Sequence, residues 1–288
     1  MALRLNTNQK LKIAQCLNRV VCGLRKACGR PNRGVFKRKG IHWGLDLNEG
    51  IDFSIFLLGA FEPADLKTYT GLIKPGDIIL DIGANVGAHT LHFARLTGPR
   101  GQVFAFEATE FAFDKMRENL RLNPELSKVV EPWHALLNSG ASGSSPSEIY
   151  SSWPLHATEQ KHQHHGGALK TVGHASVISL DEFIHKKNLK RVDFIKIDVD
   201  GNEYEVLQGA TKLLSNFKPT ILIELSPHVH DEKDPSQWDK LISLLVNSGY
   251  IFESIKGEVF NQPTSIELRK LIPINGSLNF IMKPKATR

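Results

Sequence analysis

The segment 76–90 constrains this chain more than any other, because it combines an apolar run, a glycine-rich turn and the start of an amphipathic pattern. Its letters are GDIILDIGANVGAHT. The order predicts a buried strand that ends at Asp81, then a tight turn, then a helix. Glycine permits positive φ and leaves space for a ligand against the main chain. The segment therefore predicts an α/β fold with a ligand site at the end of this strand. The alternative is a strand-to-helix turn that binds nothing.

The spacing within the turn separates the ligand classes. A dinucleotide turn has the pattern G-x-G-x-x-G, and its second glycine lets the pyrophosphate approach the backbone. Here the turn carries Gly83, Asn85 and Gly87, so a side chain occupies that second position and the last glycine comes one residue early. A phosphate-binding loop would also end in Gly-Lys-Ser/Thr. The turn disfavours NAD, and its D-x-G-x-N-x-G pattern resembles the first motif of class I S-adenosylmethionine (SAM) methyltransferases.

A second apolar run, at 101–107, ends in Glu107, 20 residues after Gly87. A nucleoside-binding α/β unit places an acid at about this distance to bind ribose hydroxyls. A terminal Glu is often only solvated, but its position relative to the turn favours the functional interpretation.

Further strands are predicted where apolar residues cluster between turn signals, at 129–137, 192–198, 219–225, 250–255 and 278–282. Amphipathic segments lie between them, including a single predicted helix over 202–214 and a helix that begins with a capping box of Ser179 and Glu182. Strands that alternate with helices form a largely parallel sheet covered on both faces. We therefore expect a Rossmann-like, mostly parallel seven-stranded sheet with an N-terminal helical or cap extension.

Charge and composition divide the chain into three parts and an insertion. Residues 1–40 carry 11 of the 36 Lys and Arg and no acid, which leaves 25 basic and 30 acidic residues in the remainder. The basic pI therefore belongs to this arm, and no specific nucleic-acid groove is expected in the domain. A cap segment is predicted at 41–75, and the SAM-binding domain at 76–288. Within that domain, the polar tract at about 138–175 is predicted to be a flexible insertion, either a substrate-facing lid or unstructured.

The arm predicts a basic amphipathic helix, because Ile13, Leu17 and Leu24 recur at helical spacing among Lys and Arg. Three roles remain open for it: packing on its own domain or on a partner subunit of a homo-oligomer, weak contact with an anionic membrane surface, or an organelle transit peptide.

The cysteine pattern and the hydropathy indicate a cytoplasmic protein. The chain has three cysteines, at 16, 22 and 28, and no C-x-x-C pair, which fits a reducing compartment. No apolar run approaches the length of a membrane span. Histidines cluster in the insertion at 156, 162, 164 and 165. Because this tract is predicted to be a flexible loop, a metal site in the insertion is not favoured.

The ordered motifs DIGANVGAHT, VFAFEAT, ENLRLN, SLDEFI, VDFIKIDVDGNEYEVLQGA and PTILIE resemble the FkbM family of SAM-dependent methyltransferases. Two features depart from the family pattern: Ala108 stands where the family usually has Pro, and the insertion is long. The resemblance implies O-methylation of a hydroxyl on a sugar, glycan or small natural product. The competing hypotheses are a catalytically silent binding or scaffold protein and an NAD-dependent oxidoreductase.

The motif and the resemblance together predict the cofactor-binding residues. These are Asp81, Gly83, Ala84, Asn85, Gly87, Thr90, Glu107, Ala108 and Asp198.

Catalytic residues are expected at the carboxyl ends of the strands, where an open α/β sheet binds its ligands. Methyl transfer is an in-line displacement that depends on alignment, and an alcohol acceptor benefits from a general base. The candidates are Asp200, Glu224, His228 and His230. We expect His228 to be the base, oriented by Glu224, with His230 as the reserve.

The metal alternative uses part of the same group. Asp198, Glu224 and His228 could together bind Mg²⁺ or Mn²⁺.

Overall fold

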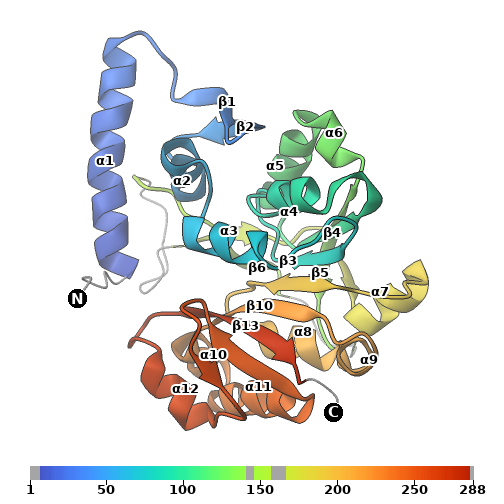
Figure 1. Cartoon of the computed structure of the whole chain (residues 1–288). Helices are drawn as coiled ribbons and strands as arrows, with labels where there is room; N and C mark the ends of the chain where they lie inside the picture. Colours follow the sequence, from blue (N-terminus) through green and yellow to red (C-terminus); the bar gives the residue numbers. More distant parts are fainter. Residues whose placement is uncertain (1–6, 141–145, 157–166, 286–288) are drawn as a thin grey trace.

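A nine-stranded sheet with helices on both faces forms the centre of the computed structural model, which describes residues 7–140, 146–156 and 167–285 (Figure 1). In spatial order the strands are β12 (Val259–Phe260), β11 (Tyr250–Ser254), β13 (Leu278–Pro284), β10 (Thr220–Leu225), β9 (Phe194–Ile197), β3 (Ile78–Ile82), β4 (Gln102–Glu107), β5 (Val130–Leu137) and β8 (Ser176–Ile178). From β10 to β8 all neighbours are parallel, and β13 is antiparallel to both of its neighbours. This is the strand order of the class I methyltransferase fold.

The seven strands predicted for this sheet are all present, and the structure adds two short edge strands that the prediction of seven omitted. β12 has two residues and β8 has three. Such short segments carry no readable periodicity, because alternation needs about four residues to be recognised.

The alternating side chains of the strands form two separate cores. Leu80 and Ile82 of β3 point to one face, where they pack with Phe183 and Trp238. Ile79 points to the other face. The first face is covered by α7 (Leu180–Lys187), α8 (Glu203–Gln208), α9 (Thr211–Asn216), α11 (Pro235–Asn247) and α12 (Ser265–Leu271). The second is covered by α2 (Gly50–Leu58), α3 (Pro63–Thr70), α4 (Thr90–Thr97) and α5 (Glu110–Arg121), with the short α6 (Pro124–Ser127) beside them.

The helix predicted over 202–214 is divided into α8 and α9. Gly209 lies at the break, and a Cβ there would come within 2.2 Å of the Asn138 carbonyl oxygen. The close approach of another chain segment therefore requires glycine at this point.

The cap segment is attached to the sheet domain through two asparagines, Asn119 of α5 and Asn123 just before α6. Asn119 Oδ1 accepts from Gly44 N, and Asn123 Oδ1 accepts from His42 N, each at 2.9 Å. Both contacts are to β2 (Ile41–Asp46), which pairs antiparallel with β1 (Arg33–Arg38). The predicted arm boundary at residue 40 therefore falls inside a hairpin, and β1 is structurally continuous with the cap.

Preceding this hairpin, α1 (Thr7–Ala27) stands along one side of the molecule (Figure 1). Within the described ranges, none of the helices combines the length and the hydropathy needed to cross a bilayer.

The insertion is partly structured. β6 (Glu148–Ser152) pairs antiparallel with β7 (Ala168–Thr171), and the chain after β6 contacts the cap, where Gly50 N donates to Trp153 O at 2.9 Å. Three of its histidines, at 162, 164 and 165, lie outside the described residues. The insertion thus brings β6 over the carboxyl ends of the central strands. The remaining helix, α10 (Pro227–Lys233), follows β10 at the same end of the sheet.

Candidate active site

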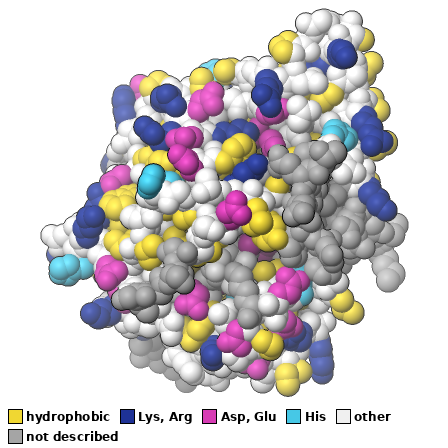
Figure 2. All heavy atoms as spheres, turned by 180° about the vertical axis from the view of Figure 1, so that it is seen from behind, with side chains coloured by type: hydrophobic (Ala, Val, Ile, Leu, Met, Phe, Trp, Pro, Cys, Tyr) yellow, Lys and Arg dark blue, Asp and Glu magenta, His cyan; other side chains and the backbone are white. Residues whose placement is uncertain are grey.

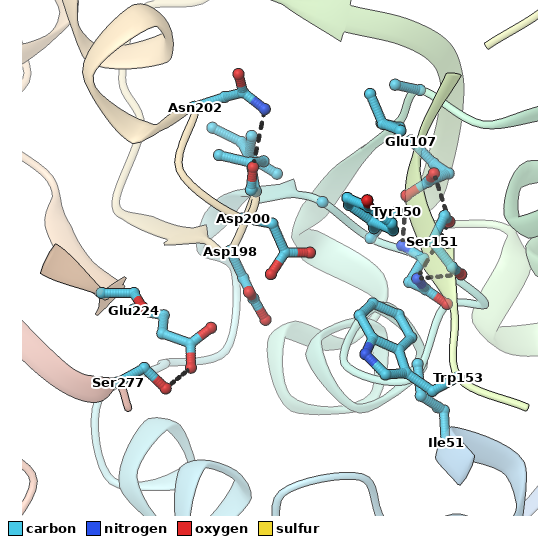
Figure 3. Close-up of a pocket in the computed structure, with 18 of the residues that line it drawn as sticks. Ile51, Glu107, Tyr150, Ser151, Trp153, Asp198, Asp200, Asn202, Glu224 and Ser277 are labelled. Carbon is cyan, nitrogen blue, oxygen red and sulfur yellow. Dashed lines mark hydrogen bonds between the residues drawn. The ribbon is translucent and has the colours of Figure 1, made fainter. Parts of the chain in front are cut away.

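A cavity of about 980 Å³ lies at the carboxyl ends of β3, β4, β9 and β10. The sheet ends form its floor, while α2, the start of α3 and the inserted β6 form its walls. Figure 3 shows carboxylates from the strand ends on one side and Glu107 with Ser151 on the other. The carboxyl end of an open α/β sheet is where such folds bind ligands.

The turn after β3 is held against the end of β9. Gly83 has φ 79°, and a Cβ there would lie 1.9 Å from the Asp198 carbonyl oxygen. Its neighbours Ala84 and Asn85 also line the cavity. Position 83 therefore requires glycine both for its backbone conformation and for lack of space.

Three of the predicted cofactor residues support the turn from behind and do not line the cavity: Asp81, Gly87 and Thr90. Thr90 Oγ1 donates to Asp81 Oδ2 at 2.5 Å, and both side chains are buried. Burial raises the pKa of Asp81. This pair ties the end of β3 to the start of α4, so it shapes the turn without a surface toward a ligand.

Glu107 lies at the end of β4 and is only 5% exposed. Its carboxylate accepts from Asn85 N at 2.9 Å and from Thr109 N at 2.8 Å, and the Ser151 hydroxyl lies 3.4 Å away. Burial raises the pKa of Glu107, although these donors act in the opposite direction. Together with Ala108 it lines the cavity.

The acidic cluster, which we define as Asp198, Asp200 and Glu224, occupies the opposite side of the cavity. Carboxylate oxygens of the three residues all lie within 4.8 Å of one another. Asp198 Oδ2 accepts from Lys196 Nζ at 2.8 Å, and Glu224 accepts from the Ser277 hydroxyl. The cluster combines carboxylates from the ends of two neighbouring strands.

The proton distribution in this cluster is uneven. Burial raises the pKa of Glu224 well above its usual range, and the Asp198 charge adds to the effect. Burial also opposes ionisation of Asp198, but the Lys196 ammonium and a hydrogen bond from Glu224 outweigh it, so the pKa of Asp198 is lowered. Asp198 is therefore the more acidic and Glu224 the more basic carboxyl group of the pair.

The two predicted histidines occupy different environments. His228 lines the cavity, with Nδ1 3.1 Å from Ser226 Oγ. His230, contrary to the prediction, is fully buried outside the cavity wall, and its Nε2 lies 3.0 Å from Glu203 Oε2. The helical turn of α10 that directs His228 toward the cavity directs His230 into the protein. His230 therefore supports packing and is excluded as a base.

The predicted metal set also needs correction. The three ligand groups that converge are the acidic cluster, so Asp200 takes the place that we expected His228 to occupy. Asp200 has φ 46°, which turns the chain sharply after β9 and brings its carboxylate back toward Asp198. The orienting contact predicted between Glu224 and His228 is replaced by the contacts of Glu224 with Asp198 and Ser277.

Two residues that the sequence reasoning missed, His89 and Glu62, also line the cavity. His89 Nε2 lies 3.6 Å from Glu62 Oε2, and its Nδ1 lies 3.3 Å from Tyr69 Oη. Burial lowers the pKa of His89 to about 4, so the ring is neutral at pH 7. His89 belongs to the motif DIGANVGAHT, and this position is the signal in the sequence that could have identified it as a site residue.

The inserted segment contributes Tyr150, Ser151 and Trp153 to the cavity (Figure 3). Sequence reasoning predicted a lid or a loop there without naming any residue, because a Ser- and Gly-rich tract has no periodicity that assigns side chains to a face.

The charge of the lining is one-sided. Among the described residues that line the cavity, eight are Asp or Glu and none is Lys or Arg. Lys196 lies behind Asp198 and is 3% exposed, so it compensates one carboxylate from within the protein. The cavity therefore presents a negative surface with apolar walls that include Leu58, Phe61 and Trp153.

Comparison with known proteins agrees with this geometry. Residues 81–252, more than half of the chain, match the family model described as the methyltransferase FkbM domain. The hexuronic acid methyltransferase AglP of Haloferax volcanii is 30% identical over 169 residues, which cover 58% of this chain and 62% of AglP. The 2-O-methyltransferase NoeI of Sinorhizobium fredii is 26% identical over 195 residues, covering 61% of this chain and 79% of NoeI. The match to methyltransferase sdnD of Sordaria araneosa covers 59% of that protein, so this chain spans less than two thirds of both AglP and sdnD.

Solved structures give a more distant likeness. The methyltransferase FkbM of Methylobacillus flagellatus KT is 15% identical, with a TM-score of 0.42, over 75% of this chain and 50% of that one. A SAM-dependent O-methyltransferase of Thermotoga maritima is 14% identical, with a TM-score of 0.42, over 92% of this chain and 83% of that one. The family match includes the Gly83 turn, Glu107 and the acidic cluster. This chain is a member of the FkbM methyltransferase family.

Proposed function

We propose that this chain is a SAM-dependent O-methyltransferase that acts on a hydroxyl group of a sugar or sugar-like acceptor. The observation that carries the proposal is that one cavity joins the Gly83 turn and Glu107 to the acidic cluster. The first pair suits a nucleoside cofactor, and the second group suits removal of a proton from an alcohol.

The residues present fit SAM. Gly83, Ala84 and Asn85 line the cavity, and glycine leaves the main chain of the turn open to a ligand. Glu107 offers a carboxylate at the end of the neighbouring strand, where ribose hydroxyls can donate to it. SAM would supply a methyl group on a positively charged sulfur, which an acceptor oxygen attacks in line. The contribution of the chain is to align SAM with the acceptor hydroxyl and to take up the proton that this hydroxyl loses.

We assign proton removal to Glu224. A partly buried carboxyl group with a raised pKa is a stronger base, once ionised, than one with an ordinary pKa. The Ser277 hydroxyl fixes the orientation of Glu224, and the Asp198 carboxylate beside it maintains the raised pKa. His228 is the competing base, and the two assignments are separated by the variants discussed below.

The donor set of the acidic cluster is all oxygen, which fits Mg²⁺ or Mn²⁺. Asp198, Asp200 and Glu224 would hold the ion, and its positive charge would lower the pKa of an acceptor hydroxyl bound next to it. Dialysis against a chelator tests this role, because activity that is lost and then restored by Mg²⁺ or Mn²⁺ requires the ion. Full activity after dialysis would leave the cluster with its proton-accepting role.

The acceptor is proposed to be neutral or amino-bearing. The printed names of AglP and NoeI, a hexuronic acid methyltransferase and a 2-O-methyltransferase, support a sugar-like acceptor. Since no Lys or Arg is found among the described lining residues, the carboxylate of a uronic acid would meet eight acidic side chains without a cation. Like charges within one cavity repel each other, and this repulsion disfavours a negatively charged acceptor. This chain should therefore differ from AglP in acceptor charge.

The experiment has a binding part and a transfer part. Calorimetry should detect micromolar binding of S-adenosylhomocysteine and no binding of NAD. Glu107→Gln should weaken the binding of S-adenosylhomocysteine by roughly ten-fold, because it removes one charge-assisted hydrogen bond. The control is Glu131→Gln on β5, where Glu131 pairs with Lys187 outside the cavity. Unchanged affinity in Glu107→Gln would remove Glu107 from the cofactor site.

In the transfer part, labelled SAM is incubated with matched methyl glycosides of a hexose, an aminohexose and a hexuronic acid. Neutral or amino glycosides should be methylated roughly ten-fold faster or more than the uronate, given the repulsion described above. A preference for the uronate would contradict the acceptor assignment while leaving methyl transfer intact. NAD binding without S-adenosylhomocysteine binding would contradict the proposed function as a whole.

A further inference from the structure

α1 exposes a continuous line of apolar side chains. Ile13, Leu17, Val20 and Leu24 are 46%, 48%, 57% and 64% exposed. Their spacing of four, three and four residues places them on one face of the helix. Scattered apolar residues on a surface need no explanation, but an aligned set on one helix indicates a binding face.

The opposite face of α1 attaches the helix to the protein. Asn18, which is 1% exposed, donates to the Leu47 carbonyl oxygen at 2.5 Å. Gln15 Nε2 donates to the Leu155 carbonyl oxygen at 2.9 Å. Because these polar contacts hold the inner face against the cap and the insertion, the apolar line is fixed in an outward orientation.

The exposed half of α1, which includes the apolar line at one edge, carries basic side chains at its other edge. Lys12, Arg19 and Lys26 follow one another at seven-residue intervals, so they form a second line, roughly 130° around the helix from the apolar one at 100° per residue. Figure 2 shows basic and hydrophobic side chains together along the projecting edge at the upper right, where α1 lies when Figure 1 is turned by 180°. Residues 1–40 carry 11 Lys and Arg and no acid, and the rest of the chain has more acids than bases, 30 against 25.

We propose that this face of α1 docks on an anionic membrane surface. The helix would lie in the interface, with the apolar line among the lipid headgroups and the basic line against their negative charges. Charge complementarity selects this occupant. A second copy of α1 would bring another acid-free helix against the first, and like charges would oppose the pairing.

The test is flotation of the full chain with extruded vesicles of phosphatidylcholine alone or with about 30% phosphatidylglycerol. We expect binding to the anionic vesicles at low salt and a loss of binding as salt increases, because screening weakens charge attraction. Leu17→Asp/Val20→Asp should reduce the bound fraction roughly ten-fold or more, since it removes apolar insertion and adds negative charge. Lys12→Gln/Arg19→Gln/Lys26→Gln should abolish the preference for anionic vesicles.

The matched control is Ile266→Asp/Ile274→Asp. These two residues are 64% and 94% exposed and lie on α12 and in the loop after it. The control carries the same change of charge and should bind like the unmodified chain. The proposal is overturned if the unmodified chain binds neither vesicle, or if Leu17→Asp/Val20→Asp binds as the control does. It is also overturned if sedimentation shows a dimer that this variant dissociates while vesicle binding is absent.

Discussion

At the scale of single residues, Gly83 has the least tolerance for change. A side chain there would collide with the Asp198 carbonyl oxygen, at 1.9 Å, and the φ of 79° is unfavourable for other residues. We predict that Gly83→Ala eliminates detectable binding of S-adenosylhomocysteine in calorimetry, because the turn and the end of β9 must move apart.

A matched control is available at Gly98, which has a similar φ of 66° but nothing within 4 Å of an added Cβ. With a ψ of −170° at Gly98, the Gly98→Ala variant is also strained, by roughly 1–3 kcal/mol, but without the collision. It should lower thermal stability slightly and keep its affinity. Equal affinities for the two variants would show that the close approach at Gly83 has no role in binding.

The assignment of the base is also decided by single residues. Glu224→Gln retains the size of the side chain but cannot take up a proton, so turnover should fall by roughly 10²–10⁴ while cofactor affinity stays near the unmodified value. His228→Ala should stay within roughly ten-fold of normal turnover.

The measurement is single-turnover transfer at saturating SAM. The reverse result, a large loss in His228→Ala and a small one in Glu224→Gln, would return the role of base to His228. His230→Ala does not test the base, because it removes the buried contact of His230 with Glu203 and is therefore expected to change the stability of the fold.

At the scale of elements, α1 is attached to the rest of the protein by the side chains of Gln15 and Asn18. Gln15 donates to the insertion and Asn18 donates to the cap, and neither of these two hydrogen bonds is to a strand of the central sheet. We predict that removal of residues 1–30 leaves a folded domain that binds S-adenosylhomocysteine with unchanged affinity. A cut at residue 36 should be less stable, because it removes more than half of β1 and leaves β2 unpaired there. Thermal unfolding of both truncated chains, with calorimetry on the shorter deletion, tests this. Loss of the unfolding transition after removal of 1–30 would show that α1 belongs to the core.

At the scale of the whole molecule, Asp52 links three elements. It is fully buried in α2, accepts from Asp46 N of β2 at 2.6 Å, and pairs with Lys115 of α5. Burial raises the pKa of Asp52 to about 6, even though Lys115 acts to lower it. The cap and the sheet domain are thus joined through a carboxylate whose ionisation is costly.

The sign of the resulting pH dependence follows from proton linkage. Between about 4 and about 6, the folded chain retains a proton on Asp52 that the unfolded chain has lost, so the contribution of Asp52 to stability falls as pH rises. An asparagine side chain at this position would not titrate. The stability of Asp52→Asn relative to the unmodified chain should therefore improve by about 2 kcal/mol between pH 4.5 and 7.5.

Urea unfolding at the two pH values measures this difference. Asp114→Asn is the control, since the Asp114 side chain is 65% exposed on α5 and its pair with Arg117 is a surface contact. A relative stability of Asp52→Asn that falls with rising pH would contradict the linkage argument.

Features that depend on neighbours along the chain could be predicted from the sequence alone. The Gly83 turn, the acid at the end of β4 and the seven main strands were all predicted correctly, because strand periodicity and turn chemistry are local properties. The Ser179 capping box at the start of α7 is likewise present as predicted, with Ser179 accepting from Glu182 N.

Which polar groups meet depends on the packing of distant segments. The Asp198 and Glu224 carboxyl groups lie together because β9 and β10 pair side by side. His228 and His230 lie two positions apart on the helix, yet one lines the cavity and the other is buried against Glu203. His89 and Trp153 line the cavity because the cap and the insertion fold over the sheet. Contacts between residues far apart in the chain depend on packing, and a pattern read along one segment contains no information about the segment that will pack against it.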